Sequence, residues 1–234
     1  MKGQWLEIEK EDRSTFSGYL SLPPTGKGPG ILLIQEIFGV NEHIQQVADQ
    51  YAMDGFVVFA PDVFWRQEEK IQLAYDESGF KKGLDFYAKC DTEKATQDLV
   101  TAANFLRKRE EVVNSIASVG YCMGGLLSYM VGAKEAVDAA VCYYPGGIDK
   151  QVNAAHQVNI PLLFHFAEKD HYIDEKAVKV VSKVFSKKAD AWVLTYPNVD
   201  HGFNCWARGM YNQPAAALAR GRTLEFLSLF LNKQ

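Results

Sequence analysis

The segment Gly120-Tyr121-Cys122-Met123-Gly124 constrains this chain more than any other feature. Its pattern, a nucleophilic residue flanked by small residues two positions away on each side, is that of a nucleophile elbow between a strand and a helix. The apolar run before it predicts the strand, and the residues after it have helical spacing. Both glycines fit, because a Cβ at either position would collide with the neighbouring strand or helix. We therefore expect Cys122 to project into a cleft; the alternative is a buried structural cysteine in a glycine-rich turn.

A cysteine nucleophile needs a base and an orienting acid, and two later loops offer them in the order nucleophile, acid, histidine. Residues 161–167 predict a buried strand that ends shortly before Asp170, and residues 191–196 predict another strand that is followed by His201. The carboxyl ends of parallel strands lie at one edge of a sheet, so we expect both side chains to converge on Cys122. His201 would take the Cys122 proton or stabilise the thiolate, and Asp170 would orient the imidazole.

These assignments have competitors. Asp170 could be an ordinary solvated turn carboxylate. His171 is the most serious rival to His201, although it follows Asp170 directly and has no acid from an earlier strand end. His165 lies within an apolar run and is expected to pack in the core. The remaining imidazoles are His43 and His156.

The order of the expected elements predicts the fold class. Strands are expected near 4–10, 16–21, 31–35, 56–60, 116–121, 139–144, 161–167 and 191–196, and helices are expected to begin near 42, 91, 125, 174 and 213. Such repeated strand–helix units imply an α/β fold with a mostly parallel central sheet and helices on both faces. Residues 23–30 are rich in Pro and Gly and are expected to form a turn between an N-terminal hairpin and the sheet. No boundary or repeat interrupts the chain, so residues 1–234 are expected to form a single domain.

Composition argues against several classes of function. The net charge of −4 comes from interspersed charges, which leave no basic stripe for nucleic acid or an anionic membrane. No apolar run approaches the roughly 20 residues of a membrane span, and no signal peptide is visible. Four scattered cysteines without a C-x-x-C pair predict no metal and suit a reducing cytoplasm. We expect no cofactor and a small-molecule substrate, and the sequence leaves open whether the protein is a monomer or a weak dimer.

The chain resembles, nearly end to end, the dienelactone hydrolase family of cysteine-nucleophile α/β-hydrolases. The resemblance is carried by residues 35–39 (QEIFG), 60–62 (APD) and 120–125 (GYCMGG), by Asp170, and by residues 201–203 (HGF). It implies the α/β-hydrolase fold. It also implies that Glu36 is the family's buried carboxylate near the thiol, where the alternative is an ordinary loop glutamate. The backbone N–H groups of Ile37 and Met123 would then form the oxyanion hole, since one amide must follow the nucleophile and one must come from the early strand–helix loop.

The substrate pocket is where the chain departs from the best-known members of this family, which hold a substrate carboxylate with arginines. An ungapped alignment puts Phe80 and Leu84 at the positions of one arginine and a nearby tyrosine. It puts Cys205 at the second arginine, with Arg208 three residues further on. We expect a more apolar pocket; the alternative is that its aromatic residues belong to the core or to a lid. The expected pocket residues are Phe38, Trp65, Phe80, Leu84, Tyr144, Cys205 and Arg208.

A cysteine nucleophile also limits the reaction. A thiol ester forms readily from activated esters and lactones but not from ordinary amides, so we expect hydrolysis of esters or lactones, as in carboxymethylenebutenolidases. One alternative is a thioesterase or a broad-range carboxylesterase on the same scaffold. Another is a non-catalytic ligand-binding protein, whose usual sign would be the loss of a triad residue. Cys122, Asp170 and His201 are all present, which favours an enzyme.

Overall fold

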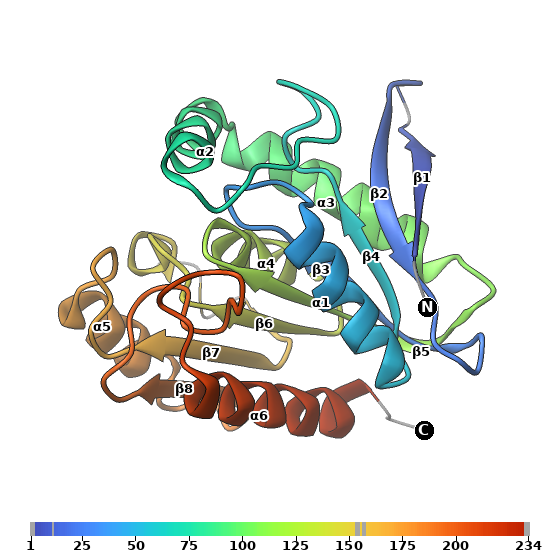
Figure 1. Cartoon of the computed structure of the whole chain (residues 1–234). Coiled ribbons are helices and arrows are strands. Elements are labelled where there is room, and N and C mark those ends of the chain that lie inside the picture. The colour runs from blue at the N-terminus through green and yellow to red at the C-terminus, as the bar shows by residue number, and fades with distance from the viewer. Residues whose placement is uncertain (1–2, 11, 153–154, 156–157, 232–234) are drawn as a thin grey trace.

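The computed structural model describes residues 3–10, 12–152, 155 and 158–231, and it is built around one eight-stranded sheet (Figure 1). The strand order is β1-β2-β4-β3-β5-β6-β7-β8. The strands are β1 (Gln4–Glu9), β2 (Thr15–Ser21), β3 (Gly28–Ile34), β4 (Val57–Pro61), β5 (Val112–Tyr121), β6 (Ala139–Tyr143), β7 (Leu162–Ala167) and β8 (Ala191–Tyr196). The helices are α1 (Glu42–Met53), α2 (Glu77–Lys89), α3 (Thr92–Arg107), α4 (Met123–Ala133), α5 (Glu175–Phe185) and α6 (Gln213–Leu231), with a short 3₁₀ turn, η1 (Ile148–Lys150).

Pairing in the sheet follows the sequence-based prediction. β1 and β2 form the expected antiparallel hairpin, and β2 runs antiparallel to β4. Every other neighbouring pair is parallel. β3 begins at Gly28 and β5 at Val112, both earlier than expected. The N–H of Gly28 donates to the carbonyl of Glu111 at 3.0 Å, so the last residues of the predicted turn belong to the sheet.

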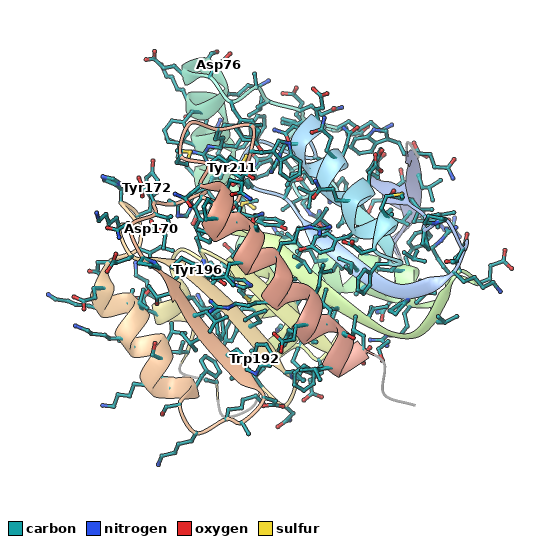
Figure 2. All side chains as sticks on the ribbon, turned by 60° about the horizontal axis from the view of Figure 1, so that its bottom comes forward. Asp76, Asp170, Tyr172, Trp192, Tyr196 and Tyr211 are labelled. Atoms are coloured by element: carbon teal, nitrogen blue, oxygen red, sulfur yellow. The ribbon has the colours of Figure 1, made fainter. Side chains whose placement is uncertain are left out.

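Helices cover both faces of the sheet, and the alternation of side chains along β3 shows how. Ile31 and Leu33 pack in one core with residues of α1, whereas Leu32 and Ile34 pack in a second core with residues of α3. α6 crosses the same face as α1, and α4 lies beside α3 on the other face (Figures 1 and 2). This arrangement leaves the carboxyl ends of the parallel strands free to carry side chains at one edge.

Helix α2 was not predicted from the sequence, in which the expected helices begin near 42, 91, 125, 174 and 213. Its side chains are mostly exposed, and the two buried residues are glycines, Gly79 and Gly83. It therefore lacks the sheet-covering apolar face that identifies the other helices, and Figure 1 shows it apart from them. Its N-cap is Asp76, whose carboxylate accepts a hydrogen bond from the N–H of Gly79 at 2.7 Å. Among the described residues, no helix has the length and apolar character needed to cross a membrane.

Candidate active site

The loops that leave the carboxyl ends of the parallel strands meet around a cleft of about 300 Å³. Glu36 follows β3, Cys122 follows β5 and His201 lies in the loop after β8, and all three line the cleft. Asp170 follows β7 and stands directly behind His201. The structure therefore brings together the four side chains that the sequence analysis took from separate loops.

The elbow at Cys122 has the sharp geometry that its sequence predicts. Cys122 has a positive φ of 58°, which few side-chain-bearing residues adopt. Its N–H donates to the carbonyl of Tyr143 at 3.0 Å, which ties the turn to the end of β6. A Cβ on Gly120 would strike the carbonyl oxygen of Gly124, and a Cβ on Gly124 would strike the carbonyl of Ile34. The two glycines thus permit the strand, the turn and the helix to approach closely enough to present the thiol.

Asp170 is held beside His201 by several hydrogen bonds. Its Oδ2 lies 2.9 Å from Nδ1 of His201. Its Oδ1 accepts hydrogen bonds from the N–H groups of Tyr172 at 2.8 Å and Ile173 at 3.0 Å, and Figure 2 shows Asp170 and Tyr172 together at this rim. The side chains of Asp170 and His201 are only 1% and 5% exposed. This fixed, buried carboxylate leaves the other imidazole nitrogen free to face Cys122, which lines the same cleft and raises the pKa of His201.

The surroundings of His201 shift the pKa of its imidazole. Burial by itself lowers the pKa of the imidazole, but the Cys122 thiolate and the Asp170 carboxylate outweigh it and raise the pKa to about 10. The favoured state of His201 at neutral pH is therefore the imidazolium. An imidazolium in the lining of the cleft can supply a proton to a leaving group.

A pH titration of the His201 imidazole tests this state. The native pKa of about 10 lies above the value of about 6.5 for an unfolded chain, so the protonated imidazole stabilises the native state. That contribution is fully present below pH ~6.5 and is lost as the pH rises through about 10. We expect the Cε1–H NMR signal of His201 to titrate near pH 10 in the wild type, and well below that in Cys122→Ala, which lacks the thiolate. An unchanged midpoint in Cys122→Ala would contradict the ion pair.

The other histidines have different surroundings. His171 pairs with Asp200 at 2.6 Å, but its side chain is 78% exposed and does not line the cleft. His165 is fully buried between Tyr196 and Thr223, as expected for a core residue, and burial lowers its pKa to about 3. His43 is buried against Trp206, and burial, with a smaller effect of Arg208, lowers its pKa to about 4. His156 lies outside the described residues.

Ile37 and Met123 border the cleft on either side of Cys122. Within the described part of the chain, neither N–H group donates to an acceptor in the turns and loops. Ile37 lies in the turn between β3 and α1, and Met123 is the first residue of α4, where helical N–H groups have no partner within the helix. Two unpaired amides at the edge of the cleft have the chemistry that an oxyanion requires.

Helix α2 contacts the turn at Ile37 through Gly83, so a substitution at this glycine tests whether the contact matters for activity. A Cβ on Gly83 would lie 2.7 Å from the carbonyl oxygen of Ile37, so either α2 or the turn must move. Alanine at position 83 should lower kcat/KM about tenfold by displacing the Ile37 amide, although alanine favours the helix itself. The matched control is Gly221→Ala in α6, where a new Cβ meets nothing within 4 Å and activity should be unchanged. Wild-type kcat/KM in Gly83→Ala would show that the contact does not position the amide.

Glu36 is a buried carboxylate with one fixed oxygen. The hydroxyl of Tyr75 donates to Oε2 at 2.9 Å. Oε1 has no hydrogen-bond partner among the described residues and lies 3.6 Å from Nη1 of Arg208. The guanidinium of Arg208 also stacks over the ring of Phe38 at 5.3 Å. Arg208 thus reaches the cleft from its position seven residues after His201, and it neutralises the buried Glu36 charge.

The structure places four of the seven expected pocket residues in the lining of the cleft: Phe38, Phe80, Leu84 and Arg208. The other three do not line it. Trp65 stacks on Phe16 at 5.6 Å and donates to Asp98, and both partners are buried, so it packs against the second core instead. Tyr144 and Cys205 are fully buried behind the site, where the ring of Tyr144 lies 4.9 Å from that of His201 and Cys205 lies beside Tyr75.

The cleft also has lining residues that the sequence analysis missed, including Tyr87, Tyr172 and Lys150. Tyr87 could have been found, because Phe80, Leu84 and Tyr87 have the i, i+4, i+7 spacing of one helical face. Lys150 ends the short turn η1 and Tyr172 lies in a loop, and neither segment carries such a periodic signal. No group of three or more His, Cys, Asp or Glu side chains suited to a metal ion occurs within residues 3–10, 12–152, 155 and 158–231.

Comparison with known proteins identifies the family of the chain. The model of the dienelactone hydrolase family matches residues 16–231. The chain belongs to the dienelactone hydrolase family. As a member of that family, it is a dienelactone hydrolase-like hydrolase. Carboxymethylenebutenolidase 1 of Cupriavidus pinatubonensis is 31% identical to it over 230 residues, which cover 98% of each chain.

Other members have similar lengths and structures. A carboxymethylenebutenolidase of Pseudomonas putida is 30% identical over 235 residues and covers 100% of both chains. A dienelactone hydrolase-like promiscuous phosphotriesterase from metagenomic libraries matches with a TM-score of 0.79 at 22% identity, covering 98% of this chain and 100% of the other. The dienelactone hydrolase of Anabaena variabilis has a TM-score of 0.68 at 16% identity, covering 99% and 100%. These structures confirm the predicted α/β-hydrolase fold.

Proposed function

We propose that this dienelactone hydrolase family member cleaves carboxylic esters or lactones with Cys122 as nucleophile, His201 as general base and acid, and Asp170 as orienting carboxylate. The observation that supports this most directly is that Cys122 and His201 line one cleft, with Nδ1 of His201 2.9 Å from the buried carboxylate of Asp170. The names of the curated relatives, carboxymethylenebutenolidases, support a lactone or a related ester as the substrate.

The reaction begins when the Cys122 thiolate attacks the carbonyl carbon. The carbon–oxygen π electrons move to oxygen, and the N–H groups of Ile37 and Met123 stabilise the resulting oxyanion. As the carbonyl re-forms, the bond to the leaving oxygen breaks, and that oxygen takes the proton of the His201 imidazolium. A thioester on Cys122 remains. His201 then removes a proton from water, the hydroxide attacks the thioester, and the thiolate leaves to release the acid.

Glu36 belongs to this proposal as a carboxylate that contacts the thiol side of the cleft. Its Oε1 is buried and has no hydrogen-bond partner among the described residues, and it shares the lining of the cleft with Cys122. Arg208 offsets the charge of this oxygen but does not hydrogen-bond to it, so a thiol proton or a substrate donor near it would be bound favourably. Tyr75 and Arg208 hold the carboxylate where it can do this.

The lining of the cleft favours a substrate with an apolar or aromatic body. Phe38, Phe80, Leu84 and Tyr87 form one wall, and Leu84 and Tyr87 are 42% and 43% exposed at its rim. Two cations, Lys150 and Arg208, also line the cleft, and Arg208 is already paired with Glu36. An anionic substituent on the substrate is therefore compatible with the cleft even though the family's usual arginine positions are occupied by Phe80 and Cys205.

A substrate panel tests the proposal and ranks the alternatives. Aryl esters, a dienelactone, acyl thioesters and matched neutral and carboxylated esters are compared by kcat/KM, beside His201→Ala. Preference for the lactone or esters supports the proposed class, whereas preference for thioesters favours a thioesterase. A wild-type protein that hydrolyses none of them would favour the ligand-binding alternative. The reducing cytoplasm, the single domain and the state of monomer or weak dimer remain predictions from the sequence.

A further inference from the structure

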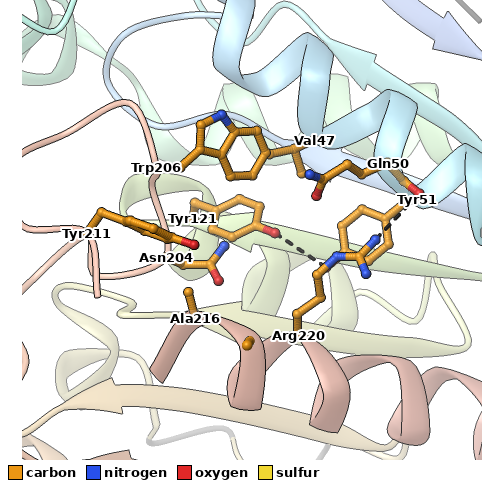
Figure 3. A pocket seen from close by; sticks show the side chains of 10 residues that line it. Val47, Gln50, Tyr51, Tyr121, Asn204, Trp206, Tyr211, Ala216 and Arg220 are labelled. Carbon is orange, nitrogen blue, oxygen red and sulfur yellow. Dashed lines mark hydrogen bonds between the residues drawn. The ribbon is translucent and has the colours of Figure 1, made fainter. Parts of the chain in front are cut away.

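A second cavity, of about 210 Å³, lies between α1, α6 and the loop that follows His201 (Figure 3). It shares no lining residue with the active-site cleft. Tyr121 at the end of β5 contributes to its wall, and the adjacent residue is Cys122. Asn204, Trp206 and Tyr211 contribute from the loop after β8. The cavity is therefore separate from the cleft but is built on the same loop and strand end.

Asn204 gives this cavity a polar group that has no hydrogen-bond partner among the described residues. The residue is only 7% exposed, and its side-chain amide forms no hydrogen bond with any described residue. Figure 3 shows the amide directed into the cavity near Tyr121 and Tyr211. The amide atoms are not among the sealed-off polar atoms of the described residues, so they are reachable from the cavity, where water or a ligand can satisfy them. An amide with both donor and acceptor atoms suits a ligand group that can also do both.

The other walls restrict the ligand further. Tyr51, Tyr121, Trp206 and Tyr211 present aromatic side chains, and the hydroxyls of Tyr51 and Tyr121 lie 3.3 Å apart. The one charged lining residue, Arg220, is paired with Asp54. A cavity with aromatic walls and a compensated charge favours a flat, neutral molecule over an anion.

We propose that this cavity is a second binding site, for a neutral compound with a single aromatic ring and one hydroxyl group, with Asn204 as its hydrogen-bond partner. A cavity of about 150 Å³ can hold a benzene ring, so 210 Å³ accommodates a ring with small substituents. The proposal concerns binding alone. It does not depend on the proposed hydrolysis, so the two can fail separately.

The test is a titration of the whole protein with 4-methylphenol, followed by NMR at the indole N–H of Trp206. This group lines the cavity and donates to Oε1 of Gln46 at 3.2 Å, so a bound ring should shift its signal. We expect a saturable shift with a dissociation constant of about 1 mM or tighter, given the size of the probe. Water alone in the cavity would give no saturable shift up to about 20 mM, which would overturn the proposal.

Three variants locate the bound phenol. Ala216→Leu fills the cavity from α6 and should weaken binding about tenfold or more. Asn204→Ala removes the hydrogen-bond partner of the phenol hydroxyl and should weaken binding severalfold. It is the second cavity variant if Ala216→Leu does not fold. Leu84→Ala changes only the rim of the active-site cleft and should leave the dissociation constant unchanged. Binding that is lost in Leu84→Ala but kept in the folded cavity variants would place the phenol in the cleft and overturn the proposal.

Discussion

Replacing Cys122 by alanine is expected to lower kcat/KM for any hydrolysed ester or lactone by about 10⁴-fold or more, as for other enzymes that lose their nucleophile. Cys122 lines the cleft, follows the strained elbow and interacts with His201. Alanine removes the sulfur that forms the thioester, and no other cysteine can replace it. Cys142 and Cys205 are buried, and burial raises the pKa of both thiols, to about 12 for Cys205.

The matched control for this variant is Cys90→Ala. Cys90 and Cys122 are the two partly exposed cysteines of the chain, but Cys90 caps the end of α2 and does not line the cleft. We expect Cys90→Ala to retain wild-type kcat/KM. If Cys122→Ala kept the wild-type rate, or if both variants lost activity equally, Cys122 would not be the nucleophile.

Replacing Asp170 by asparagine is expected to lower kcat about 10³- to 10⁴-fold with little change in stability, as in the related serine triad. Oδ1 of the asparagine can still accept the N–H groups of Tyr172 and Ile173. Its amide nitrogen, however, would face Nδ1 of His201 and favour the wrong tautomer. The loss should therefore appear in kcat, with the thermal unfolding midpoint close to that of the wild type.

The chain contains a second His–Asp pair that controls for this effect. Asp200 lies 2.6 Å from Nδ1 of His171, close to the distance in the proposed catalytic pair, but at the exposed surface. Asp200→Asn keeps an acceptor for the N–H of His201 and should reduce kcat far less than Asp170→Asn. Equal losses in the two variants would mean that the loop, and not the proposed catalytic pair, limits the rate.

The core of the candidate site could be predicted from sequence because it depends on topology. Strand runs identify the carboxyl edge, and Cys122, Asp170 and His201 each follow a strand that ends there. The long separation of these residues along the chain does not matter, since parallel pairing through β5, β6, β7 and β8 brings the strand ends together. The order of Cys122, Asp170 and His201 along the chain is read directly from the sequence.

The walls of the cleft were harder to predict because they depend on side-chain direction within loops. Trp65, although aromatic and expected in the pocket, stacks on Phe16 instead. Cys205 stands four residues after His201, but the tight loop directs it into the core and brings Arg208 to Glu36 instead. Helix α2 covers the cleft and not the sheet, so its apolar face is narrow and half exposed. The hydrophobic spacing that identified the other helices is therefore weak in this segment.

The most direct test of the account is to identify the acyl-enzyme. The wild type is mixed with 4-nitrophenyl acetate, quenched in acid during the burst of 4-nitrophenol, and examined by mass spectrometry of the intact chain and its peptides. The account predicts one acetyl group per chain, on the peptide that contains Cys122, and none on Cys122→Ala. Turnover by a wild-type protein that carries the acetyl group elsewhere, or hydrolysis by Cys122→Ala at the wild-type rate, would contradict it.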